Sequence, residues 1–124
     1  TLMSSNTSSW PQHMLNMSAG DVLVIFDIRR YEDDIATLAN VAKDVGVTIV
    51  LFTDYWTSPV AKYARHSFKV QIEAPSAWDS SVVTLFVVEA LIEAVQNSAW
   101  DETRERIHTL EGLFEHARLF RRPR

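Results

Sequence analysis

Two apolar runs in the sequence end in side chains that could bind or transform a ligand. The first run, Val22–Phe26, is followed by a charged segment that contains Asp27, Arg29, Arg30 and Tyr31. The second run, Val47–Phe52, is followed by Thr53 and Asp54. Arginine binds phosphate or carboxylate through paired hydrogen bonds, and two neighbouring carboxylates could polarise hydroxyl groups or share acid–base chemistry. The pattern indicates a site for a small polar ligand, and the arginines favour an anion.

The elements that must position these side chains are strands. Short, continuous apolar runs are typical of strands covered on both faces, as in parallel sheets with helices on each side. Ligands of such sheets bind outside the carboxyl ends of the strands. Both polar segments are therefore predicted at the same edge of one sheet.

The order of the predicted elements defines the fold class. The chain is predicted to open with the end of a strand at Thr1–Met3, followed by a short helix that is capped by Ser8 or Ser9 and has Pro11 in its first turn. The strands predicted after it are Val22–Asp27, Val47–Phe52 and an edge strand, Phe68–Ile72. Four further helices are predicted: Tyr31–Val45, Ser81–Asn97, Asp101–His116 and one that starts at Ser58-Pro59. Gly46 is predicted to end the first of them. Alternating strands and helices predict an α/β fold, a three-layer α/β/α sandwich with a parallel sheet.

Composition limits the classes of function. A chain of 124 residues with 47% apolar residues suits one domain with a real core. No cysteine is present, which fits a reducing cytoplasm, and the apolar runs are too short or too charged to span a membrane. A formal net charge of −4 argues against nucleic-acid binding by this chain alone. The four histidines have no spacing that would bind a metal, and no cofactor is predicted.

Several motifs together carry a resemblance to a known family. They are FDIRRY at Phe26–Tyr31, TD at Thr53–Asp54, SP at Ser58–Pro59 and DS at Asp79–Ser80. From Gly20 to Leu113 the sequence resembles the sugar-isomerase (SIS) domain of RpiR-type bacterial transcriptional regulators, in a branch with an FDxRRY motif. The resemblance implies a flavodoxin-like sandwich with a five-stranded parallel sheet. It also implies a homodimer that senses a phosphosugar or another small anionic metabolite in the cytoplasm.

The resemblance further implies parts of a protein that this sequence does not contain. A DNA-binding helix-turn-helix domain would precede the SIS domain, and the opening strand and helix of the SIS fold are also expected before Thr1. Residues 1–124 are thus expected to be an N-terminally incomplete effector-binding and dimerisation domain, which reaches DNA only through the separate domain. Family members hold phosphate in a loop rich in serine and threonine, whereas this sequence has Asp27-Ile28-Arg29-Arg30-Tyr31 there.

The predicted ligand contacts are Asp27, Arg29, Arg30, Tyr31, Thr53, Asp54, Ser58, Asp79 and Ser80. Each has a structural alternative. The arginines form either an anion clamp or ion pairs with the aspartates, and at most one of two consecutive arginines faces a ligand. Aspartates at strand ends commonly cap helices or hold arginines, and Ser58, Asp79 and Ser80 are helix caps first and ligand contacts second.

Three functions remain open at this point. The first is a dimeric, non-catalytic sensor that shifts an attached DNA-binding domain between states. The second is a phosphosugar isomerase, for which Glu89 or Glu93 could supply the general base. The third is a domain that only dimerises, which arginines paired with their own aspartates would favour. The helix Ser81–Asn97 is apolar almost all round, which predicts burial against a partner subunit as well as the sheet.

Overall fold

The computed structural model describes residues 1–4, 6–75 and 78–117, and it divides into two compact units. The first unit is Thr1–Thr84 and the second is Leu85–Arg124. The first unit contains every strand of the described chain, and the second contains most of two long helices.

A parallel sheet of three strands forms the centre of the first unit. The strands β1 (Val22–Phe26), β2 (Thr48–Thr53) and β3 (His66–Lys69) lie in the order β1-β2-β3. Both pairs are parallel, and the register aligns Phe26 with Phe52 and Phe52 with Phe68. The predicted α/β class with a parallel sheet is confirmed, although the described sheet has three strands rather than five. The third strand was predicted at Phe68–Ile72; β3 lies at one edge of the described sheet, but it begins two residues earlier and ends three residues earlier.

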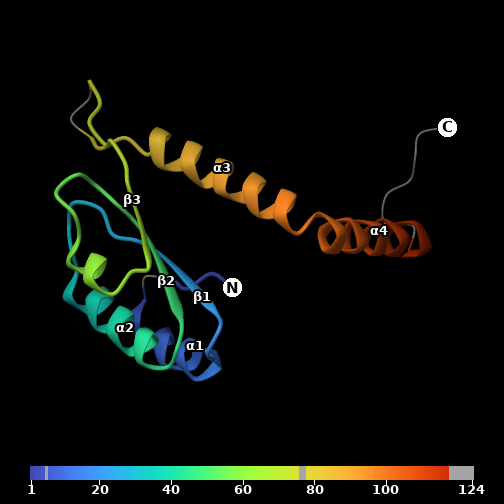
Figure 1. The fold of residues 1–124 in the computed structure, drawn as a ribbon, viewed down its shortest axis with the longest axis horizontal. Coiled ribbons are helices and arrows are strands. Elements are labelled where there is room, and N and C mark those ends of the chain that lie inside the picture. Colours follow the sequence, from blue (N-terminus) through green and yellow to red (C-terminus); the bar gives the residue numbers. More distant parts are fainter. Residues whose placement is uncertain (5, 76–77, 118–124) are drawn as a thin grey trace. The chain divides into compact units, whose positions relative to one another are not determined.

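Helices cover one face of this sheet (Figure 1). Two helical elements of the first unit precede β1, the 3-10 helix η1 (Thr7–Ser9) and α1 (Trp10–Asn16). Helix α2 (Asp33–Asp44) lies between β1 and β2, and the 3-10 helix η2 (Pro59–Lys62) lies between β2 and β3. The buried core lies between α2 and the sheet, and it consists of Ile25, Ala39, Ala42, Val47, Ile49, Leu51 and Val60. Gly46 ends α2 as predicted: its φ is +90°, and a Cβ there would lie 2.9 Å from the Cβ of Ala19.

The opposite face of the sheet is largely open within the first unit. On β1, Val22, Val24 and Phe26 are 60%, 43% and 49% exposed, because alternate residues of a strand point to opposite faces. The prediction that β1 is covered on both faces is therefore wrong for this unit. One residue of this face is fully buried, namely Phe52, whose ring is stacked between those of Phe26 and Phe68 at centroid distances of 4.9 and 5.1 Å.

Three local predictions are corrected by the structure. Thr1–Met3 forms no strand. Ser9 makes no side-chain capping bond, and Asn6 instead accepts a hydrogen bond from the Ser8 backbone at the start of η1. The helix predicted from Ser58 is only the four-residue η2, because the chain turns at Tyr63 and enters β3 three residues later.

Two long helices form most of the second unit. Helix α3 spans Val82–Ser98, so that its first turn belongs to the first unit, and α4 spans Trp100–Ala117. Their axes differ by 94°. Neither helix has a buried residue within the second unit, and the burial of α3 against the sheet and a partner subunit stays a prediction. Among the described residues no single helix is long and apolar enough to cross a membrane; α3 and α4 meet that test only as a bent pair.

Candidate ligand site at the carboxyl ends of the strands

The predicted site residues gather where β1 and β2 end. We call this region the rim, and it consists of residues 27–31, 53–58 and 79–80. Asp27 continues the ladder of the sheet, since its backbone N–H donates to the carbonyl of Phe52 over 3.0 Å. The parallel register of the two strands thus brings Asp27 and Asp54 to the same edge, as the sequence predicts.

Asp54 is the centre of the rim. Its carboxylate is fully buried and accepts a hydrogen bond from the Tyr31 hydroxyl and another from the backbone N–H of Arg29, at 2.7 Å. The backbone N–H groups of Trp56 and Thr57 donate to it at 3.1 and 3.2 Å. Burial alone would raise the pKa of Asp54, but these four donors outweigh burial and hold the pKa below its ordinary value. Asp54 is therefore ionised and ties two loops together.

Both loops held by Asp54 contain a residue in the left-handed region of backbone conformation. The φ of Arg29 is +60° and that of Thr57 is +67°, and neither residue is glycine. This conformation directs the N–H of each residue to the same carboxylate. It also explains why α2 begins at Asp33 rather than at Tyr31: the preceding residues are held by Asp54 instead of entering the helix.

Tyr31 acts as a hydrogen-bond donor at the rim. Burial and the hydrogen bond to the Asp54 carboxylate raise the pKa of Tyr31 to about 12. The phenol is thus protonated at all physiological pH values. It orients Asp54 and is not available as a base.

A second buried cluster joins Asp27, Ser58 and Thr53. The hydroxyl of Ser58 donates to Asp27 and accepts from the backbone N–H of Val60 at 3.0 Å, which is the predicted helix-cap role. The backbone N–H of Ser58 donates to the Thr53 hydroxyl at 3.0 Å. All three side chains are at most 2% exposed. These polar groups are hydrogen-bonded to one another, so they fix the buried part of the rim.

The pKa of Asp27 is raised, in contrast to that of Asp54. Burial is the main cause, the nearby Asp54 carboxylate adds to it, and hydrogen bonding from Ser58 and from the backbone of Glu32 opposes it. Because the folded-state pKa lies above the ordinary value, the folded chain binds more protons than the unfolded chain in that range of pH. Protonation of Asp27 therefore favours the folded state as the pH falls.

We expect Ser58→Ala to destabilise the fold by about 1–3 kcal/mol at pH 7, since the ionised Asp27 loses its buried donor. The loss should shrink as the pH falls through the raised pKa of Asp27, because a protonated carboxyl no longer depends on that donor. Urea unfolding followed by circular dichroism at pH 7 and at acid pH measures both effects. The exposed Ser81→Ala is the control, and an equal loss at every pH would contradict the role assigned to Asp27.

The two arginines have different environments. The Nε of Arg29 lies 2.7 Å from Oδ2 of Asp79, and its guanidinium lies 5.9 Å from the centroid of a Trp56 ring. Arg30 is exposed, and among the described residues its side chain has no hydrogen-bond or ion-pair partner. Arg29 thus forms the predicted ion pair with an aspartate of the chain, whereas the guanidinium of Arg30 is open to an anionic ligand.

Ser80 serves as a helix cap. Its hydroxyl accepts from the backbone N–H of Val82 at 3.3 Å, and its own N–H donates to the carbonyl of Ile72 at 2.7 Å. Asp79 is thereby placed next to Arg29. The predicted site residues are brought together, but most of them bind one another. The backbone donors at Trp56 and Thr57 were not predicted; the available signal was Asp54 itself, because aspartate side chains in turns commonly accept from backbone N–H groups a few residues later.

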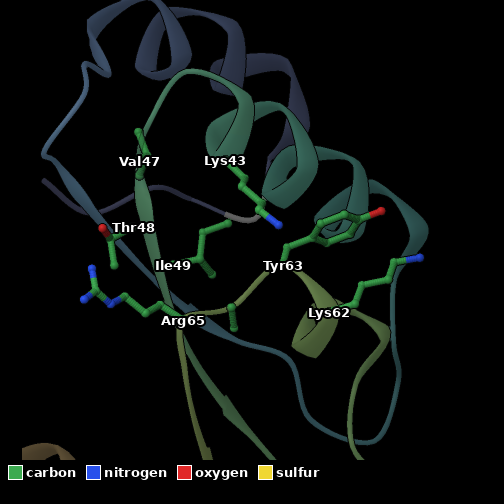
Figure 2. Close-up of a pocket in the computed structure, with 8 residues that line it drawn as sticks. Lys43, Val47, Thr48, Ile49, Lys62, Tyr63 and Arg65 are labelled. Atoms are coloured by element: carbon green, nitrogen blue, oxygen red, sulfur yellow. The ribbon is translucent and has the colours of Figure 1, made fainter.

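Two surface hollows contain no residue of the rim. One, of about 240 Å³, is lined by residues at the amino ends of β2 and β3, among them Lys43, Lys62 and Arg65. Figure 2 shows that Arg65 extends to the opposite side from the two lysines, so these cations do not converge on one point. The other lies on α4. Within the described residues, no cluster of three or more histidine, aspartate and glutamate side chains could hold a metal ion.

Comparisons with known proteins agree on one fold. The family model of the SIS domain matches residues 1–94. The structure is similar to that of the sugar isomerase domain of an RpiR transcription factor from Sphaerobacter thermophilus, with a TM-score of 0.72 and 24% sequence identity. The match covers 95% of this chain and 63% of the other, so this chain spans less than two thirds of that domain. No curated protein matches this chain.

Proposed function

We propose that this chain, which belongs to the SIS domain family, is the effector-sensing and dimerisation domain of an RpiR-type transcriptional regulator. The solved structure that it resembles carries the name of an RpiR transcription factor, which supports this choice within the family. The domain acts in the cytoplasm as a homodimer and reaches DNA through a separate domain. Its effector is a small anionic metabolite, and a phosphosugar is the first candidate.

The observation that carries the proposal is the unpaired guanidinium of Arg30 on a loop whose backbone is already fixed. Asp54 holds that loop through the N–H of Arg29 and the hydroxyl of Tyr31. A ligand therefore meets a preorganised loop and does not have to order it, which favours binding. The first turn of α2 carries Asp33 and Asp34, so the anion is bound by the guanidinium rather than by the end of that helix.

Binding studies with matched arginine variants test this site. Hexose phosphates, pentose phosphates and small carboxylic acids are screened by thermal shift, since a tight ligand raises the apparent stability by mass action. For a compound that stabilises the protein, we expect Arg30→Ala to weaken binding about 10- to 100-fold, as a charged hydrogen-bonded pair is lost. Arg29→Ala is the matched control and should weaken it less. A ligand that binds the Arg30→Ala protein unchanged would contradict the proposed site.

A non-catalytic role follows from the same features. The loop after β1 lacks the serine and threonine with which the resemblance implies that phosphate is held, and it begins with the buried Asp27, which is bound by Ser58. The effector must bind two states of the regulator with different affinity, because equal affinity would shift neither. Turnover of a phosphosugar by the protein would contradict this part of the proposal.

A second candidate function is dimerisation alone. The ion pair between Arg29 and Asp79 favours it, since one of the two rim arginines is already neutralised within the chain. The same screen separates the two functions. Dimerisation alone predicts no thermal shift with any of these compounds and a protein that still self-associates.

A further inference from the structure

Helix α4 carries a narrow apolar stripe with the spacing of a coiled-coil seam. Alternating steps of three and four residues connect Trp100, Thr103, Ile107, Leu110, Phe114 and Ala117, which are positions a and d of successive heptads. Trp100, Ile107 and Leu110 are 53%, 44% and 49% exposed. Leu113, at a flanking g position, is 59% exposed and widens this stripe at one point, but the a and d spacing is the one with which helices pair.

The sizes of the seam residues favour an antiparallel copy of the same helix. When two copies of α4 run in opposite directions with Ile107 opposite Leu110, Trp100 lies opposite Ala117 and Thr103 lies opposite Phe114. In the outer layers a large side chain then faces a smaller one, while Ile107 and Leu110, which are equal in volume, face each other in the central layers. Parallel pairing would instead place Trp100 against Trp100 and Ala117 against Ala117. The helix is thus complementary in volume to itself only when it is reversed.

The flanking charges agree with the same arrangement. In an antiparallel pair the two e positions face each other, and these are Arg104 and Glu111. Among the described residues Arg104 has no ion-pair partner, and Glu111 has only a 4.0 Å contact with His108. The two-fold symmetry of a homodimer produces the Arg104–Glu111 pair twice. In a parallel pair the partner of Glu111 would be Arg106 instead.

We propose that α4 is a homodimer contact, in which the α4 helices of two copies pair antiparallel along this seam. An apolar hollow of about 360 Å³ on α4 is lined by Ile107, Leu110 and Leu113, among others. The second copy fills this hollow. The seam extends over two and a half heptads of α4. This inference rests on the self-association in the proposed function and specifies its surface.

Charge reversal tests the seam in the protein as it exists. We expect Glu111→Arg to raise the dimer dissociation constant about tenfold in sedimentation velocity, because two attractive pairs become repulsive. Arg104→Glu combined with Glu111→Arg should restore the wild-type value, whereas Arg106→Glu combined with Glu111→Arg should not. Rescue by the Arg106 variant instead would overturn the antiparallel arrangement. Leu110→Asp, at an exposed position, should abolish the seam while helical circular dichroism is retained.

Introduced cysteines give an independent readout, because the chain contains none. Trp100→Cys combined with Ala117→Cys should form an intermolecular disulfide under mild oxidation, since the two positions are about 25 Å apart within one straight helix. Neither single variant should cross-link. Dimers that resist Leu110→Asp would overturn the seam and leave dimerisation intact, whereas a monomeric wild-type protein would overturn both the seam and the proposed self-association.

Discussion

Asp54→Ala is expected to destabilise the first unit by about 3–5 kcal/mol, because it removes a buried carboxylate and leaves four partly buried donors without an acceptor at once. The hydroxyl of Tyr31 and the backbone N–H groups of Arg29, Trp56 and Thr57 all lose their shared partner. A loss of that size is a large fraction of the stability of a typical domain. Urea unfolding followed by circular dichroism at pH 7 measures it.

Two controls identify the cause of that loss. Asp54→Asn keeps one acceptor oxygen and the size of the side chain, so it should cost less than the alanine variant. Asp79→Ala removes an aspartate of the same rim that is half-exposed and paired with Arg29, and it should change stability by no more than about 1 kcal/mol. Equal losses at the two positions would show that Asp54 has no special role.

Phe52→Ala should have the second large effect on stability, also about 3–5 kcal/mol. The ring is fully buried although it lies on the open face of the sheet, because the rings of Phe26 and Phe68 stack against it. Truncation removes its own apolar burial and both ring contacts, and it leaves a cavity at the centre of the three strands. The midpoint of urea unfolding should fall without a change in its steepness.

The neighbouring aromatic residue supplies the matched comparison. Phe26→Ala removes one ring contact from a side chain that is about half exposed, so it should cost clearly less than Phe52→Ala. Phe52→Leu retains most of the apolar volume and should cost less than half as much as Phe52→Ala. If Phe26→Ala cost as much as Phe52→Ala, the central position of Phe52 in the sheet would not be the reason for its effect.

Much of the fold could be predicted from the sequence because the pattern of each element is local. The apolar runs of β1 and β2, the glycine that ends α2 and the long apolar helix α3 are found within about two residues of their predicted bounds. Periodicity depends only on near neighbours along the chain. The position of the rim could be predicted once the strands were known, since parallel strands in crossover order end at one edge of the sheet.

The partners of the rim residues could not be predicted in this way. Whether an arginine after β1 faces solvent or Asp79 depends on the path of a segment fifty residues later in the sequence. The apolar run of β1 predicted two covered faces, but the exposure of Val24 depends on which other segments reach that face. Such outcomes are decided by tertiary contacts rather than by local propensity.

The way Asp54 holds its loop has a consequence for redesign of the domain. The group that it binds at position 29 belongs to the main chain and not to the arginine side chain. The side chain of Arg30 has no hydrogen-bond or ion-pair partner among the described residues, so the residue type at position 30 can also be exchanged while this bond is kept. A small library confined to position 30 would vary the charge and size of the loop while its architecture is preserved.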